Sequence, residues 1–203
     1  MYTLTLEKYY KNALPLLEQG EECLQELLKE YPVKETRDGI QPVLYVNSRL
    51  KKPESMIEKL KKKGVPTDSA SALKNTHDAI GVRVICSFVE EVYRLSRWLY
   101  NRSEIRIIGE KDYIAYPKPN GYRSLHLLVA FTDKHLEGIT AEIQLRTIAI
   151  DFWAVLEHQM KYKRNIKHET TIRQELKRCA DEIASVDVSM QTIRDILRSE
   201  EWE

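Results

Sequence analysis

Residues 122–146, YRSLHLLVAFTDKHLEGITAEIQLR, contain the alternating pattern that decides the fold. The runs Tyr122–Phe131 and Ile139–Arg146 alternate apolar and polar residues, and a period of two predicts a β-strand with one buried face. The apolar face holds Leu125, Leu127, Val129, Phe131, Ile143 and Leu145. The opposite face holds Tyr122, Ser124, His126, Glu142, Gln144 and Arg146. This pattern predicts either a functional face or the ordinary solvated face of an antiparallel sheet.

Segments whose apolar residues have helical spacing lie before and after these two strands in the sequence. Residues 4–31 predict a helix interrupted near Gly20, and a loop with Pro32, Gly39 and Pro42 follows it. Further predicted helices are Pro53–Lys63, Val92–Tyr100, Thr147–Lys163 and 170–198, and further strands are Ile80–Phe88 and Ile105–Ile108. Trp98, Phe152 and Trp153 are expected in the core. We expect an α+β fold with a mixed sheet of about five strands and flanking helices.

The composition narrows the class of protein. The chain has 203 residues, 31% of them charged, with a formal net charge of +1. An anion site must therefore come from local clustering, because the whole surface is not basic. The sequence shows no signal peptide, no apolar run long enough to cross a membrane, and three cysteines without disulfide or zinc spacing. We expect a cytoplasmic protein that does not act at a membrane.

The loop at residues 111–126, KDYIAYPKPNGYRSLH, concentrates hydrogen-bond donors beside an aromatic ring. Lys111, Lys118 and His126 can neutralise a polyphosphate, and Tyr122 offers a flat face on which a base can stack. Pro-Asn-Gly alone predicts only an ordinary turn. Its combination with these donors indicates a nucleotide site.

A second basic cluster lies at residues 49–63. Arg49 and Lys51 come just before a predicted helix, and Ser55 and Lys59 are four residues apart on one helical face. A triphosphate needs about this many donors. Lys61–Lys63 are interpreted as a solvated face.

Four segments together resemble the synthetase domain of the RelA/SpoT family. They are Ser48–Lys51 with Ser55 and Lys59, His77–Arg83, Lys111–His126, and Glu142–Thr147. The chain is most similar to the stand-alone small alarmone synthetases of the RelP type. The resemblance implies a nucleotidyltransferase-like domain at 41–165, with helical extensions at 1–40 and 166–203. It also implies transfer of the β,γ-pyrophosphate of ATP to the 3′-hydroxyl of GTP or GDP, with release of AMP and without a hydrolase activity.

The resemblance assigns a role to each motif residue. It implies that Arg49 and Arg83 hold adenine, while Lys51, Ser55 and Lys59 hold the ATP phosphates. Asp78 and Glu142 would bind Mg²⁺, and Glu142 would act as the general base. The residues implied around GTP or GDP are Tyr122, as the stacking ring, with Lys111, Lys118, Asn120, His126 and Gln144. The family resemblance further implies a homotetramer built through the terminal helices.

Other interpretations stay open. A toxic synthetase would use the same donor site to pyrophosphorylate the 3′ end of tRNA, and a basic run near the C-terminus would contact the RNA backbone. That run holds Lys161, Lys163, Arg164, Lys167, Arg173, Lys177 and Arg178. A non-catalytic nucleotide sensor is the third interpretation, although it would not need both Asp78 and Glu142. Asp78 as a turn cap and Arg83 as a buried ion-pair partner are the simpler roles for those two residues.

Overall fold

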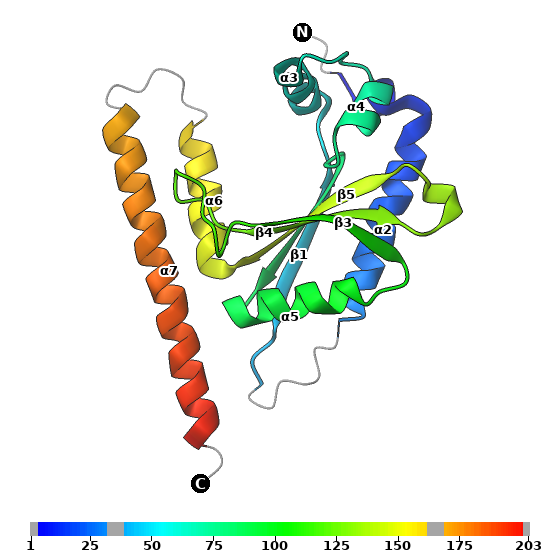
Figure 1. Ribbon diagram of the computed structural model, residues 1–203. Helices are drawn as coiled ribbons and strands as arrows, with labels where there is room; N and C mark the ends of the chain where they lie inside the picture. The colour runs from blue at the N-terminus through cyan, green and yellow to red at the C-terminus, as the bar shows by residue number, and fades with distance from the viewer. Residues whose placement is uncertain (1–3, 32–38, 162–168, 201–203) are drawn as a thin grey trace.

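A five-stranded mixed sheet forms the centre of the protein (Figure 1). The computed structural model describes residues 4–31, 39–161 and 169–200. The strands are β1 (Val43–Leu50), β2 (Ile80–Cys86), β3 (Ile105–Asp112), β4 (Leu125–Phe131) and β5 (Thr140–Thr147). Their spatial order is β1-β2-β5-β4-β3, with β2 and β5 parallel and the other neighbours antiparallel. The predicted α+β fold with a mixed sheet is confirmed.

The helices occupy the places that periodicity predicts, with one addition. They are α1 (Leu6–Tyr10), α2 (Leu14–Lys29), α3 (Pro53–Lys63), α4 (Ser69–Asn75), α5 (Val89–Tyr100), α6 (Ile148–Lys161) and α7 (Glu169–Glu200). The short helix α4 and the edge strand β1 were not predicted. Most of β1 is exposed, so its residues do not alternate between a buried and a solvated face.

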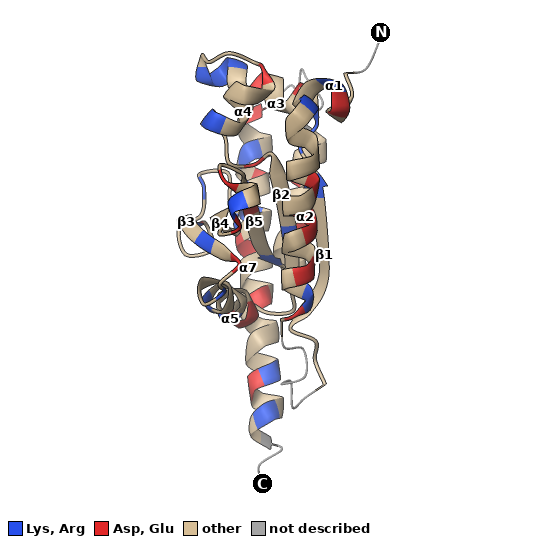
Figure 2. Ribbon diagram, turned by 90° about the vertical axis from the view of Figure 1, so that its right-hand side faces the viewer, with Lys and Arg blue, Asp and Glu red and all other residues tan. Residues whose placement is uncertain are grey.

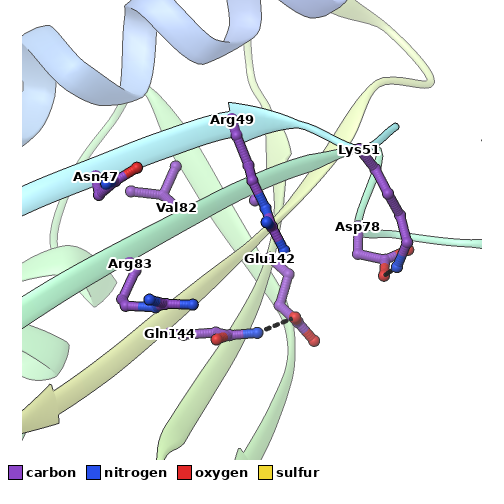
Figure 3. Close-up of a pocket in the computed structure, with 9 residues that line it drawn as sticks. Asn47, Arg49, Lys51, Asp78, Val82, Arg83, Glu142 and Gln144 are labelled. Atoms are coloured by element: carbon purple, nitrogen blue, oxygen red, sulfur yellow. Dashed lines mark hydrogen bonds and ion pairs between the residues drawn. The ribbon is translucent and has the colours of Figure 1, made fainter. Parts of the chain in front are cut away.

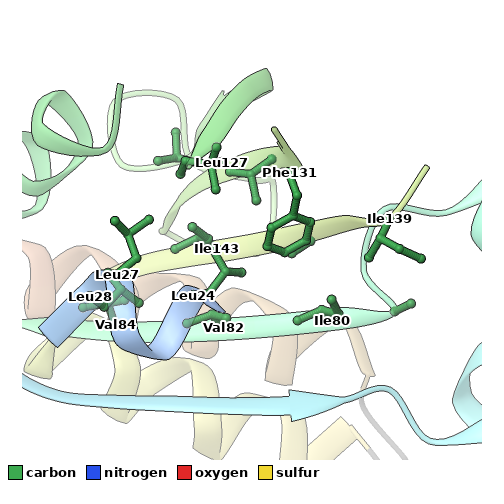
Figure 4. Packing of buried hydrophobic residues seen from close by; sticks show 14 of the residues in the cluster. Leu24, Leu27, Leu28, Ile80, Val82, Val84, Leu127, Phe131, Ile139 and Ile143 are labelled. Carbon is green, nitrogen blue, oxygen red and sulfur yellow. The ribbon is translucent and has the colours of Figure 1, made fainter. Parts of the chain in front are cut away.

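The apolar face of the sheet is covered by α2 and α5. Leu24, Leu27 and Leu28 of α2 pack over Val82 and Ile143 in one continuous core (Figure 4). The helix α5 contributes buried side chains to the same core, namely Val92, Leu95 and Leu99. The apolar stripe of residues 6–31 therefore packs on its own domain, and the proposed domain divisions at residues 40 and 165 stay predictions.

Gly20 does not interrupt the N-terminal helix. The break comes at Lys11, which has a positive φ of 49°, and Gly20 lies inside α2. A Cβ atom at Gly20 would lie 2.9 Å from Ile80 Cδ1 and 3.0 Å from Phe131 Cζ. The glycine therefore allows α2 to approach the sheet closely, and the predicted interruption was wrong.

The opposite side of the sheet carries α6 and α7 (Figure 1). Trp153 is buried as expected and Trp98 packs partly buried against the core, but Phe152 is 61% exposed, so its assignment to the core was wrong. Within the described ranges, no helix is long and apolar enough to cross a membrane. Figure 2 shows Lys and Arg gathered around α3 and α4, where Lys61, Lys62 and Lys63 are exposed as predicted.

Candidate active site

A cavity of about 200 Å³ opens on the polar face of the sheet (Figure 3). It is lined by Asn47, Arg49, Lys51, Asp78, Gly81, Val82, Arg83, Glu142 and Gln144. These residues come from β1, β2, β5 and the segments that directly follow β1 and precede β2. Six residues predicted for the site therefore line one cavity, and they include both carboxylates, Asp78 and Glu142.

Strand register explains why residues far apart in the sequence meet here. Asn47 lies opposite Arg83, and Arg83 lies opposite Gln144. Gln144 lies opposite His126, which in turn lies opposite Lys111, so one row of polar residues crosses all five strands. Side chains in such a row point to the same face of a sheet.

Gly81 supplies space in the neighbouring row. It lies between Arg49 on β1 and Glu142 on β5. Of the atoms in the described ranges, a Cβ atom built on Gly81 would meet only the backbone oxygen of Arg49, at 3.8 Å. The missing side chain therefore leaves open the part of the cavity between an arginine and a carboxylate.

Asp78 is held by two lysines. Oδ2 of Asp78 lies 2.5 Å from Lys51 Nζ and 2.7 Å from Lys59 Nζ. Burial alone would raise the pKa of Asp78, but hydrogen bonds and charges from both lysines outweigh it and lower that pKa. Oδ1 of Asp78 is buried and has no hydrogen-bond partner in the described part of the chain. Ser55 is exposed on the first turn of α3, one turn before Lys59.

Glu142 is held at both of its oxygens. His126 Nδ1 lies 3.2 Å from Oε1, and Gln144 Nε2 donates to Oε2 at 2.7 Å. Burial would raise the pKa of Glu142, but His126, Gln144 and the charge of Lys59 together lower it to about 2. Glu142 is therefore ionised at neutral pH.

Arg146 completes a bonded network on the polar face. Its Nη2 donates to Tyr122 Oη at 2.8 Å and to Gln144 Oε1 at 2.9 Å. Tyr122 Oη lies 2.8 Å from His126 Nε2. Arg146 is only 4% exposed and His126 only 7%. A buried, internally bonded network is not the solvated face of an ordinary antiparallel sheet, so the functional interpretation of this face is favoured.

Asp151 extends the network toward the edge of the sheet. It lies 2.9 Å from Arg146 Nη1 and 3.4 Å from Arg83 Nη1. The Tyr45 hydroxyl donates to its Oδ2 at 3.4 Å. Arg83 is thus both an ion-pair partner and a cavity residue. Burial and the nearby Arg146 lower the pKa of Arg83.

The loop before β4 lies beside the cavity without lining it. Lys118 Nζ lies 4.4 Å from the ring centroid of Tyr113 and 4.8 Å from that of Tyr122. Asn120 Nδ2 donates to Glu157 Oε1 at 3.0 Å, and Asn120 Oδ1 accepts from the Tyr122 backbone at 3.3 Å. Asn120 therefore contributes to the loop's own structure, whereas Tyr122 connects to the cavity through His126 and Glu142.

Comparison with known proteins identifies the family. A family model described as "Region found in RelA / SpoT proteins" matches residues 48–167. The chain belongs to the RelA/SpoT family. A relative from Bacillus subtilis (strain 168), GTP pyrophosphokinase YwaC, is 41% identical over 159 residues, which cover 77% of this chain and 76% of that protein.

Solved structures of small alarmone synthetases have the same fold. Small alarmone synthetase 1 from Bacillus subtilis, bound to its product pppGpp, matches with a TM-score of 0.81 and 30% identity, covering 93% of this chain and 98% of that one. Small alarmone synthetase 2 from the same organism matches with a TM-score of 0.79 and 37% identity, covering 92% and 98%. The predicted family is confirmed, and the RelP subtype stays a prediction.

Three residues of the site were missed at the level of sequence. Arg146 was placed on the polar face by the alternation of β5, but it received no role. Asn47 lies on β1, the strand that the sequence did not reveal. Asp151 lies in the first turn of α6, five residues after Arg146, and only the fold brings it to Arg83 on β2.

Proposed function

We propose that this member of the RelA/SpoT family is a GTP pyrophosphokinase that makes a (p)ppGpp-type alarmone. It transfers the β,γ-pyrophosphate of ATP to the 3′-hydroxyl of GTP or GDP and releases AMP. The observation that carries this proposal is one cavity that Asp78 and Glu142 line together with two arginines and a lysine, Arg49, Arg83 and Lys51. The names of the relatives and the pppGpp-bound neighbour support the same reaction.

The donor nucleotide binds along β1 and the start of α3. Arg49 and Arg83 stand on adjacent strands, and guanidinium planes stack on a base better than ammonium groups do. Lys51 and Lys59 converge on the same carboxylate, so both point to the place where phosphates would bind. Ser55 contributes from the exposed first turn of α3.

Mg²⁺ fits the two carboxylates of the cavity. Within the described residues there is no group of three or more side chains that could hold a metal by themselves. Mg²⁺ commonly uses only one or two protein carboxylates, with water and substrate phosphates as its other ligands. Oδ1 of Asp78, which has no partner among the residues that the structure describes, offers one such ligand, and Glu142 offers another. When bound, Mg²⁺ would neutralise charge on the transferred pyrophosphate.

Glu142 accepts the proton of the acceptor hydroxyl. A pKa of about 2 keeps it ionised but makes it a weak base in the ligand-free protein. Phosphoryl-type transfer depends chiefly on alignment and charge neutralisation, so a well-oriented weak base can serve. His126 and Gln144 provide that orientation through both oxygens of Glu142.

The acceptor nucleotide binds on the β4 side of Glu142. Tyr122 stacks on guanine, and the cations Lys111 and Lys118 neutralise its phosphates. His126 and Gln144 both contact Glu142, and Gln144 also lines the donor cavity, so these two residues connect the acceptor region to that cavity. Asn120 acts by holding the loop that carries Tyr122.

ATP labelled at its γ-phosphate, supplied with GTP, GDP or tRNA, tests the proposed reaction. We expect label in a guanosine product and an equal amount of AMP. Label on tRNA would favour the toxic-synthetase alternative, and no AMP with any acceptor would favour a nucleotide sensor. In the described part of the basic run, Arg173, Lys177 and Arg178 each pair with an acidic neighbour on α7, which disfavours an RNA-binding patch.

We also propose a homotetramer in the cytoplasm, where ATP and GTP are available. On α7, Val186, Met190, Ile193 and Leu197 are all at least half exposed. Their spacing of four, three and four residues places them in one stripe, which is typical of a helix that packs against another helix. Because the N-terminal stripe is buried in its own core, the C-terminal helices are the better candidates for assembly. Sedimentation equilibrium would measure the oligomeric state.

A further inference from the structure

The helix α7 packs directly on the loop that precedes β4. Gly121 has a positive φ of 90°, and a Cβ atom there would lie 2.6 Å from Ala180 Cβ and 3.2 Å from Lys177 Cα. Only a glycine allows the loop to approach α7 this closely. The small side chain of Ala180, which is buried, is equally required by this contact.

The two residues after Gly121 also contact α7 or its surroundings. Tyr122 packs against a small cluster in which Trp153 of α6 joins Ala180 of α7. Arg123 Nη2 lies 3.2 Å from Asp181 Oδ1. Three consecutive residues of the loop are therefore held from the same side, and the central one is the tyrosine that faces His126.

The helix α7 is itself fixed to the sheet. The Thr147 hydroxyl at the end of β5 donates to Asp187 Oδ2 at 2.5 Å, and both residues are buried. Trp153 Nε1 on α6 donates to the backbone oxygen of Leu176 at 2.8 Å. Further along, Arg194 pairs with Glu90 at the start of α5 at 2.5 Å. Such anchors make α7 a rigid support for the loop.

We propose that α7 is a positioning element for the acceptor nucleotide and acts through Gly121–Ala180 and Arg123–Asp181. It holds the Tyr122 ring where guanine stacks and keeps the Tyr122 hydroxyl on His126. This inference rests on the proposed function, because it takes Tyr122 as part of the acceptor site. The family model ends at residue 167, before α7 begins, so the inference concerns a part of the chain outside that match.

The donor and acceptor sites should respond differently to a change on α7. The proposed donor-site residues lie outside the loop that α7 supports. Arg49 is on β1, Lys51 directly follows β1, and Arg83 is on β2. A displaced loop should therefore weaken binding of GTP and leave binding of ATP unchanged. A general loss of stability would change both KM values or the amount of folded enzyme.

Ala180→Leu tests the inference in the full chain. The larger side chain has no room beside Gly121 and must displace the loop. We expect the KM for GTP to rise about tenfold or more, while the KM for ATP changes by less than about twofold. Ser185→Leu, at an exposed position on the same helix, is the matched control and should change neither value. An unchanged KM for GTP in a folded Ala180→Leu enzyme would overturn the inference.

A second set of variants decides the question if Ala180→Leu does not fold. Arg123→Ala and Asp181→Ala remove one partner each of a partly exposed ion pair, so each should raise the KM for GTP about two- to fivefold. If both act through their contact, the double variant should match the single variants. If the effects of the two single substitutions multiply in the double variant, a role for this contact would be contradicted. An unchanged KM for GTP in these variants would contradict it as well.

The wild-type enzyme separates this inference from the proposed function. If wild-type protein forms no AMP with ATP and GTP, the proposed function itself fails. If it forms AMP normally and the α7 variants leave the KM for GTP unchanged, only the role of α7 fails.

Discussion

Arg146 and Glu142, both on β5, are joined by two chains of hydrogen bonds that begin at the same atom, Arg146 Nη2. One chain passes through Gln144, with bonds of 2.9 and 2.7 Å. The other passes through Tyr122 and His126, with distances of 2.8, 2.8 and 3.2 Å. Arginine can only donate and an ionised carboxylate can only accept, so with a neutral imidazole every bond points toward Glu142. Arg146 therefore orients the proposed general base from a distance.

Arg146→Lys tests this orienting role. Lysine keeps the positive charge but loses the fork of donors that reaches Tyr122 and Gln144 together. We expect kcat to fall about tenfold or more, while the KM for ATP changes little. Arg106→Lys, at an exposed position on β3, is the control and should behave as wild type. An unchanged kcat in a folded Arg146→Lys enzyme would show that the network is not needed.

Gly81→Val tests whether the cavity is the donor site. The glycine has ordinary strand geometry and open space around it, so valine should fold well there while filling the gap beside Arg49 and Glu142. We expect the KM for ATP to rise about tenfold or more, with no loss in the thermal unfolding midpoint. Gly109→Ala on β3, outside the cavity, should leave the KM for ATP unchanged. Normal ATP binding by Gly81→Val would place the donor elsewhere.

The alternation of polar and apolar residues predicted the sheet because each strand of the pair β4–β5 has one fully buried face. Leu127, Val129 and Ile143 are completely buried, as that pattern requires. The edge strand β1 escaped prediction because Leu44, Tyr45 and Val46 are all exposed, so burial does not alternate along it. The predicted helix break at Gly20 was wrong because this glycine allows close packing of α2 on the sheet, which no local sequence pattern reveals.

The candidate site was predicted where its residues fall in short motifs, and missed where tertiary contacts define it. Asp78 and Glu142 were expected to meet, and they line the same cavity. Asp151 could not be expected at the site, because its partner Arg83 lies on another strand and reaches it only through the fold, although Arg146 is five residues away in the sequence. The roles of the motif residues toward ATP, GTP and Mg²⁺ remain proposals that the variants described here test.

Asp78→Asn tests the proposed metal ligand. The substitution keeps the size of the side chain but removes the charge that Mg²⁺ requires. We expect the Mg²⁺ concentration at half-maximal activity to rise about tenfold or more. Titration of activity with MgCl₂ at saturating ATP and GTP measures this value. A titration curve that coincides with that of the wild type would show that Asp78 is not a metal ligand.

Stability at low pH reports the environment of Glu142. Its native pKa of about 2 lies below its ordinary value of 4.5, so between these pH values the unfolded chain binds a proton that the native protein does not. The stabilisation of the folded protein by the ionised Glu142 is therefore complete above pH 4.5 and is lost as the pH falls toward 2. On this account, wild type should lose on the order of 1–3 kcal/mol more unfolding free energy than Glu142→Gln over this range. Urea unfolding of both proteins at several pH values measures the difference, and parallel profiles would contradict it.

Glu142→Gln tests most directly whether this carboxylate activates the acceptor hydroxyl. Glutamine keeps the size of the side chain but cannot accept the proton. The account predicts that the variant binds a non-hydrolysable ATP analogue and GTP nearly as wild type does. It should release AMP at least about 10²-fold more slowly when ATP, GTP and Mg²⁺ are supplied together. AMP release at the wild-type rate would show that the reaction does not depend on Glu142 and would contradict the proposed mechanism.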